Sequence, residues 1–187
     1  MDVRLKPAVI CLSSRMGAGK STLANSLAGA LGWAHTSFGD YVREIARQRG
    51  SDQSREALQQ IGEELISTNV QSFSQAVISQ LDWRNGCVID GIRHRQVFQA
   101  IENIVNPLPT FLVFVDIDES VRRKRLHERG MTDDQIDAAD RHSTEAQVRG
   151  TLKQHADIVL DGSRDIPDLV IAVRTFIQGK QLPATAL

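Results

Sequence analysis

Short apolar runs alternate with longer segments of helical periodicity along this chain. The runs lie at residues 8–12, 32–38, 86–90, 110–116 and 157–160. Between them, apolar residues recur every three to four positions, as on one face of an amphipathic helix. The run at 110–116 is continuously apolar, which is typical of a strand in the centre of a parallel sheet. Strands that alternate with helices predict an α/β fold, with a central parallel five-stranded sheet covered by helices on both faces.

A block of helices interrupts this alternation between the second and third strands. One predicted helix opens at Asp40, a second begins near Ser54, and a third carries apolar residues from Val70 onward. We interpret residues 38–82 as a helical insertion into a single domain that spans residues 1–187, a length that suits one domain with a real core.

The composition is that of an ordinary soluble globular domain. The chain has 187 residues, of which 41% are hydrophobic and 24% charged, and its net charge is −1. A near-neutral chain has no bulk attraction to nucleic acid or membranes, so neither is expected as a partner. Cys11 and Cys87 lie in apolar runs, where buried thiols are favoured; a disulfide would require an oxidising compartment. We expect a cytoplasmic protein, and the oligomeric state stays open.

A glycine-rich turn follows the first apolar run and precedes the first helix. Strand, turn and helix in this order are the context of a phosphate-binding loop, whose backbone N–H groups and helix N-terminus face a polyphosphate. The expected ATP-binding residues are Met16, Gly17, Ala18, Gly19, Lys20, Ser21 and Thr22. Lys20 would reach the β- and γ-phosphates and Ser21 would bind Mg²⁺. The usual pattern begins with glycine, where this chain has Ser14. The loop predicts the three-layer fold of P-loop NTPases.

Two further segments resemble the acceptor site of adenylate kinases. Residues 36–43, with Gly39, Asp40 and Arg43, resemble the Thr/Ser-x-Gly-Asp-x-x-Arg run of that family. Residues 90–93 look like its Asp-Gly-Phe-Pro-Arg run, shortened by one residue, and Gln96 falls near the glutamine that contacts the acceptor base. The chain is therefore similar to nucleoside-monophosphate kinases.

This resemblance implies a role for each residue. Arg43 and Arg93 would grip the phosphate of the acceptor, because a planar guanidinium binds phosphate oxygens in pairs. Asp90 ends its strand beside the loop, where it could hold Mg²⁺ through water or orient the attacking phosphate. Phosphoryl transfer is mostly positioning and charge neutralisation, so a kinase needs cations on both substrates.

A basic helix after the fourth strand has the place of the lid in these kinases. Arg122, Arg125 and Arg129 fall on one face by spacing. The resemblance implies a short helical lid at about 122–142, in which Arg125 and Arg129 are catalytic candidates and Arg141 is a further one. A solvated helix face is the alternative.

The end of the last strand provides the remaining candidates. A helix predicted from about Ser143 leads to that strand. The turn with Gly162 and Ser163 resembles the segment of dephospho-coenzyme A kinases whose backbone contacts the donor adenine.

The expected function is an ATP- and Mg²⁺-dependent kinase that moves the γ-phosphoryl of ATP onto a (deoxy)nucleoside monophosphate or a similar phosphorylated small molecule. Dephospho-coenzyme A is the alternative acceptor, although the Asp-x-Asp run of those kinases is missing after the second strand. A nucleotide-binding switch or an accessory ATPase in nucleic-acid metabolism is the alternative from another class. Such a protein would not need an acceptor clamp of the kind that Arg43 and Arg93 suggest.

Overall fold

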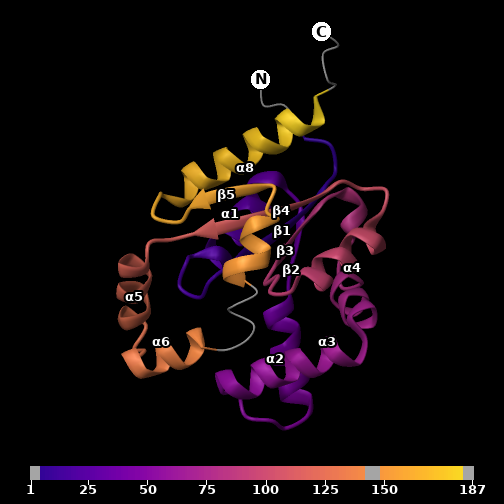
Figure 1. Ribbon diagram of the computed structural model, residues 1–187. Helices are drawn as coiled ribbons and strands as arrows, with labels where there is room; N and C mark the ends of the chain where they lie inside the picture. The colour runs from indigo at the N-terminus through magenta and orange to yellow at the C-terminus, as the bar shows by residue number, and fades with distance from the viewer. Residues whose placement is uncertain (1–4, 142–147, 183–187) are drawn as a thin grey trace.

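Five parallel strands form the centre of the molecule in the computed structural model, which describes residues 5–141 and 148–182 (Figure 1). The strand order is β2-β3-β1-β4-β5. The strands are β1 (Val9–Ser14), β2 (Ala34–Ser37), β3 (Cys87–Asp90), β4 (Thr110–Asp116) and β5 (Ile158–Asp161). Each of the predicted strands is present within two residues of its expected bounds, so the predicted α/β architecture is confirmed.

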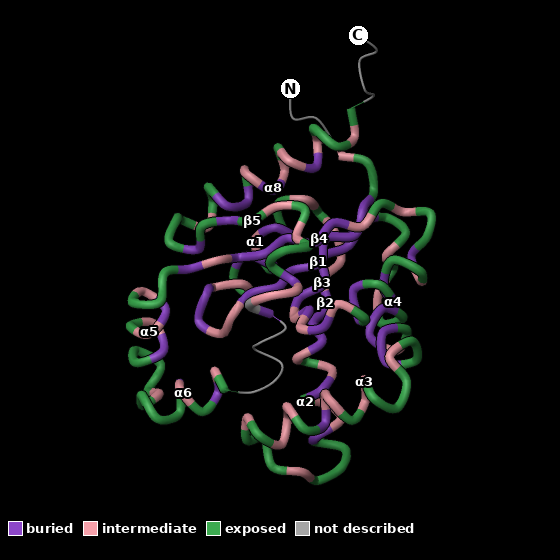
Figure 2. The backbone as a smooth tube through the Cα atoms, in the orientation of Figure 1, coloured by how far each residue is buried: buried purple, intermediate pink, exposed green. Residues whose placement is uncertain are grey.

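Helices cover both faces of the sheet because the side chains of β1 alternate between them. Val9 and Cys11 pack into the core beneath the helices α2 (Phe38–Gln48), α3 (Arg55–Ile78) and α4 (Arg95–Val105). Ile10 and Leu12 pack into the opposite core, beneath α1 (Lys20–Leu31) and α8 (Ile166–Gln181). These β1 side chains are fully buried, and Figure 2 shows the buried backbone gathered in the strands. Burial on both faces accounts for the continuous apolar run that predicted β1.

The three helices predicted in the helical insertion are present, and the second and third of them are continuous with each other. The second and third predicted helices form the single element α3, which is kinked at Asn69, where the backbone is extended (φ −165°, ψ 95°). The Asn69 side-chain oxygen accepts a hydrogen bond from the Ser72 N–H at 2.9 Å, as an N-cap does for a new helix. The kink therefore restarts the helix without a loop.

The helices α5 (Glu119–Glu128) and α6 (Asp133–Asp140) lie at one end of the molecule, after β4 (Figure 1). Thr132 caps α6 in a capping box with Gln135, whose side chain reaches back to the Thr132 N–H. The helix expected from about Ser143 begins outside the described residues; a short π-helical segment, η2 (Val148–Leu152), follows before β5. A 3₁₀ turn, η1 (Trp83–Asn85), precedes β3.

Both cysteines are free thiols buried in the sheet. Burial raises the pKa of Cys87 to about 12 and raises the pKa of Cys11 well above its usual value. The interpretation as buried thiols is therefore correct, and the disulfide that the sequence left open does not form.

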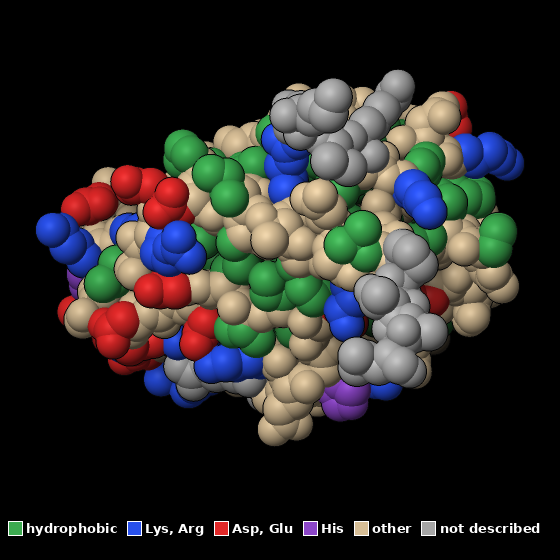
Figure 3. All heavy atoms as spheres, turned by 90° about the horizontal axis from the view of Figure 1, so that it is seen from above, with side chains coloured by type: hydrophobic (Ala, Val, Ile, Leu, Met, Phe, Trp, Pro, Cys, Tyr) green, Lys and Arg blue, Asp and Glu red, His purple; other side chains and the backbone are tan. Residues whose placement is uncertain are grey.

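The surface mixes charge and apolar groups. On the face seen in Figure 3, most acidic side chains gather at the left end with basic ones among them, and hydrophobic and polar groups cover the middle. Among the described residues, none of the helices combines the length and the hydropathy that a membrane span requires.

Candidate active site

The loop between β1 and α1 encloses a small cavity of about 180 Å³. The seven loop residues expected to bind ATP, Met16 to Thr22, all line it, together with four others: Ser14, Arg15, Arg93 and Arg129. Gly17 and Gly19 have φ values of +89° and +84°, which favour glycine. A Cβ on Gly17 would lie 3.0 Å from the Leu126 Cγ, so the loop also packs closely against α5.

Two serine side chains at the end of β1 stabilise the loop through hydrogen bonds to the backbone. The Ser13 hydroxyl donates a hydrogen bond to the Ile92 carbonyl at 2.7 Å, and the Ser14 hydroxyl donates to the Arg15 carbonyl at 2.9 Å. Both serines are buried. The residue that replaces the usual first glycine is thus accommodated by a local hydrogen bond.

Lys20 and Asp90 form an ion pair at the junction of the loop and the sheet. Asp90 is the last residue of β3 and is 2% exposed. Burial lowers the pKa of Lys20, the Asp90 carboxylate opposes that shift, and the Arg93 guanidinium adds to it. The ammonium therefore stands among opposing charges at the place where a phosphate would compete with Asp90 for it.

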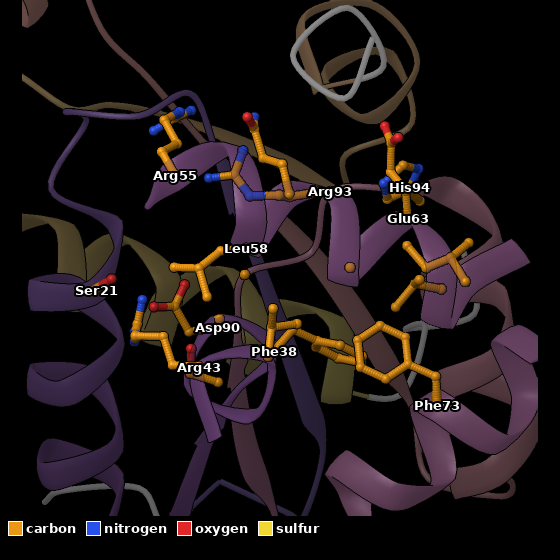
Figure 4. A pocket seen from close by; sticks show the side chains of 18 of the residues that line it. Ser21, Phe38, Arg43, Arg55, Leu58, Glu63, Phe73, Asp90, Arg93 and His94 are labelled. Atoms are coloured by element: carbon orange, nitrogen blue, oxygen red, sulfur yellow. The ribbon is translucent and has the colours of Figure 1, made fainter. Parts of the chain in front are cut away.

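A larger cavity of about 410 Å³ adjoins the loop and is walled by residues of α2, α3 and α4 (Figure 4). Six of the predicted site residues line it: Lys20, Ser21, Gly39, Arg43, Asp90 and Arg93. Gly91 has a φ of +91°, and a Cβ there would lie 3.4 Å from the Gly39 backbone nitrogen. Glycine at this turn lets the end of β3 pass close to the start of α2.

Two predicted substrate-binding residues lie outside this cavity. Asp40 is exposed and forms an ion pair with Arg43 on the solvent side of α2. Gln96 is exposed on α4, whose inward positions are taken by His94 and Val97. The described structure therefore does not support direct contact of either side chain with an acceptor in this cavity.

A row of polar residues on α3 was not predicted from the sequence. Arg55, Gln59 and Glu63 recur at four-residue intervals and all line the larger cavity. The Arg55 guanidinium also contacts the Met16 sulfur in the phosphate-binding loop. Their i, i+4 spacing was visible in the sequence, but nothing there indicated which face of α3 would meet the site.

The three arginines predicted to share one face of the lid helix have three different environments. Arg122 is fully buried and forms ion pairs with Glu119 and Asp140. Arg125 is partly buried and donates a hydrogen bond to the Gly162 carbonyl at 3.0 Å. Arg129 lines the small cavity. The side of the helix that these residues were predicted to share therefore lies against the phosphate-binding loop. Arg122 is buried in that contact.

Arg15 joins the same charge cluster from the loop. It forms ion pairs with Glu119 and Asp140, the two carboxylates that also bind Arg122. Hydrogen bonds from Arg122 and Arg15 lower the pKa of Glu119 to about 2. The cluster connects the loop to α5 and to the end of α6. The further lid candidate, Arg141, is exposed immediately after that end and lines neither cavity.

The turn after β5 packs against the loop. A Cβ on Gly162 would lie 2.8 Å from the Asp116 carbonyl oxygen and 3.2 Å from the Ala18 carbonyl oxygen, so only glycine fits. Ser163 is exposed, and its hydroxyl donates to the Asp161 carboxylate at 2.7 Å. The structure therefore brings Gly162 to the loop, with Ser163 beside it at the surface.

The proposed metal ligands suit a magnesium ion that is carried by a nucleotide. The Ser21 and Asp90 side chains both line the larger cavity beside the loop. No cluster of three or more histidine, cysteine, aspartate or glutamate side chains suited to a metal occurs within the described residues. A hydroxyl and a carboxylate fit Mg²⁺, which takes oxygen ligands and is usually held by one or two protein groups with phosphates and water.

Two groups of known proteins resemble this chain in amino-acid sequence. Adenylate kinase isoenzyme 1 of Gallus gallus is 29% identical over 124 residues, which are 65% of this chain and 63% of that enzyme, so the match spans less than two thirds of the enzyme. A UPF0200 protein of Pyrobaculum aerophilum is 30% identical over 132 residues, 68% of this chain and 70% of that protein.

A solved structure extends the likeness of fold over nearly the whole chain. Shikimate kinase of Aquifex aeolicus superimposes with a TM-score of 0.61 at 19% identity, and the match covers 94% of this chain and 99% of that one. The model of the AAA_17 family, described as an AAA domain, matches residues 16–141, which begin in the phosphate-binding loop and end after α6. The chain therefore belongs to the AAA_17 family, and the adenylate kinases and UPF0200 proteins are among its relatives.

Proposed function

We propose that this protein is a kinase that uses ATP and Mg²⁺ to transfer the γ-phosphoryl group to a nucleoside monophosphate or a similar phosphorylated small molecule. ATP would occupy the phosphate-binding loop and the acceptor would occupy the larger cavity. Mg²⁺, when bound, would bridge the phosphates of ATP and neutralise their charge.

One observation carries the proposal: the two cavities share Lys20, Ser21 and Arg93. A donor phosphate in the loop and an acceptor in the larger cavity would meet at these three residues. Catalysis of phosphoryl transfer requires this arrangement, in which cations and a metal-binding hydroxyl surround the transferring group.

The arginines of the larger cavity favour an acceptor that carries a phosphate. Arg43, Arg55 and Arg93 line it, and Arg55 and Arg93 lie toward the same side in Figure 4. A phosphate can accept hydrogen bonds from several guanidinium groups at once, which an uncharged sugar does less well. Apolar side chains from the helices line much of the remainder, which suits a flat ring better than a polyol.

Two alternatives are kept as outcomes of the test. Dephospho-coenzyme A is a phosphorylated acceptor of a different shape, and an accessory ATPase or switch would need no acceptor. The free, buried thiols fit a protein that works in a reducing compartment such as the cytoplasm.

The test is a turnover assay of the purified protein with ATP and Mg²⁺. The acceptors are a panel of ribo- and deoxynucleoside monophosphates, dephospho-coenzyme A and shikimate, and a reaction without acceptor is the control. We expect a nucleoside diphosphate as product and little hydrolysis of ATP alone. Phosphorylation of dephospho-coenzyme A only, or hydrolysis unaffected by every acceptor, would contradict the proposal.

A further inference from the structure

The helix α3 presents two parallel rows of residues to the larger cavity. Arg55, Gln59 and Glu63 form a polar row at four-residue spacing. An adjacent row consists of Leu58, Gly62 and Ile66. Residues at this spacing lie above one another on one helix face. A molecule in the cavity therefore lies along α3 and meets a cation, an amide and a carboxylate in turn.

The cationic end of the polar row lies at the phosphate-binding loop. Arg55 contacts Met16 of that loop, and Figure 4 shows it on the same side of the cavity as Ser21. From Arg55 to Glu63 the helix rises by about 12 Å, at 1.5 Å per residue. This span suits the length of a nucleoside monophosphate, whose phosphate would lie at Arg55 and whose base would lie at Glu63.

The far end of the cavity offers a carboxylate and an amide to the base. Glu63 and His94 lie across the cavity from Ser21 in Figure 4, and Phe73 lies on the same side. Gln59 also lines the cavity, and its side-chain nitrogen is buried and has no hydrogen-bond partner within the described structure. Gly62, between them in sequence, adds no side chain, which leaves the helix surface open to a flat ring.

We propose that the acceptor cavity selects guanine, through paired hydrogen bonds to Glu63 and a hydrogen bond from Gln59. This inference rests on the proposed function, since it names the base of the acceptor. An ionised carboxylate only accepts hydrogen bonds, and its two oxygens match two adjacent N–H donors. Guanine presents a ring N–H beside an amino group, and its neighbouring carbonyl oxygen accepts from an amide.

The other bases do not offer this pattern. Adenine and cytosine carry an amino group beside a bare ring nitrogen, whose lone pair would face a carboxylate oxygen. Thymine and uracil have one ring N–H between two carbonyl oxygens. A matched pair of hydrogen bonds discriminates between bases by roughly 10- to 100-fold. Glu63 is thus the residue that sets the preference, and Gln59 orients the ring.

Calorimetric binding of GMP, AMP, CMP, UMP and IMP to the full-length protein tests the inference independently of turnover. We expect GMP to bind about 10- to 100-fold more tightly than the other three common bases. IMP lacks the amino group and should bind more weakly than GMP. The substitution Glu63→Gln should reduce binding of GMP to the level of the others.

Glu64→Gln is the matched control, because Glu64 is the next residue on α3, is exposed, and pairs with Arg49 away from the cavity. It should keep the preference for GMP. Equal binding of all five nucleotides by the wild type, or a preference for GMP that survives Glu63→Gln, would overturn the inference. Phosphoryl transfer without base preference would contradict this inference and support the proposed function. Selective binding of GMP without phosphoryl transfer would support this inference and contradict the proposed function.

Discussion

The ammonium group of Lys20, the first residue of α1, forms an ion pair with the carboxylate of Asp90, the last residue of β3. This pair connects the phosphate-binding loop to the end of the sheet. A phosphate that enters the loop would share Lys20 with Asp90, and Asp90 would then be free to turn toward a metal ion.

Lys20→Ala should reduce kcat by about 10²–10³-fold, because a cation directed at the transferring group is lost. The substitution also leaves the buried Asp90 carboxylate without this partner. The double variant Lys20→Ala/Asp90→Asn therefore serves as a control for folding, checked by circular dichroism. Turnover at the wild-type rate by a folded Lys20→Ala variant would end the kinase proposal.

Arg93→Lys should reduce both kcat and the affinity for the acceptor, because Arg93 lines both cavities and lysine lacks the planar fork. The sequence predicted that Arg93 takes part in catalysis and binds the phosphate of the acceptor, so that this variant would leave the affinity for ATP nearly unchanged. Arg43→Lys is the comparison, since Arg43 lines only the larger cavity. We expect it to raise KM for the acceptor with little change in the affinity for ATP. Titrations of each substrate and steady-state kinetics separate these effects, and an unchanged kcat in Arg93→Lys would contradict the placement between the sites.

Arg122→Met should destabilise the fold by about 3 kcal/mol, because removal of the buried guanidinium takes a counter-charge away from the carboxylates of Glu119 and Asp140. Arg15 still pairs with both carboxylates, so the lower end of the usual range applies. Arg129→Met, at an exposed position, should change stability by no more than about 0.5 kcal/mol. Urea denaturation of the two variants measures the difference, and equal stability would show that Arg122 contributes only as a solvated charge.

The stability of the protein should fall between pH 4.5 and pH 2 in part through Glu119. Its pKa is lowered to about 2 in the folded chain by Arg122 and Arg15, from an ordinary value of 4.5. The folded state therefore binds this proton less readily than the unfolded state, so the contribution is complete above pH 4.5 and is lost as pH falls toward 2. Glu119→Gln should show a shallower decline over this range. Denaturant unfolding at pH 5 and pH 3 is the measurement, and parallel declines would exclude a contribution from Glu119.

Gly162→Ala should destabilise the protein by about 1–3 kcal/mol and weaken ATP binding. The added Cβ would meet the Asp116 and Ala18 carbonyl oxygens, and the second of these belongs to the phosphate-binding loop. Gly179→Ala is the control: it lies on α8 with no atom within 4 Å of the added Cβ, and it should stabilise the helix by about 0.5–1 kcal/mol. ATP affinity and melting temperature are measured for both, and normal ATP affinity in the Gly162→Ala variant would separate this turn from the loop.

The sheet and the phosphate-binding loop could be predicted because their signals are local. A strand buried on both faces is apolar throughout, as in 110–116, and the loop places its glycines and Lys20 within one short segment. The burial of Arg122 could not be predicted in this way. Its partner Asp140 lies 18 residues away, and its neighbour in the cluster, Arg15, lies near the start of the sequence. Spacing showed that Arg122 shares a face with Arg125, but not that the face would be covered.

The residues that line the larger cavity were likewise predictable only in part. Arg43 was found by resemblance, whereas Gln59 and Glu63 belong to no motif and gain significance only when α3 packs across the end of the sheet. Gln96 is exposed because one residue of difference along a helix turns a side chain from the cavity to solvent, and its contact with an acceptor stays a prediction. Val97, the next residue on α4, lines the cavity.

Because Cys11 lies on the central strand, the rate at which its thiol reacts with a reagent can be used to measure opening of the core. The thiol is covered by helices on its face of the sheet, and β1 has a paired strand on either side. Its raised pKa keeps it in the unreactive thiol form. A thiol reagent can therefore reach it only when the covering helices move away from the sheet or the sheet itself opens, so the rate of its labelling measures how often that core is exposed.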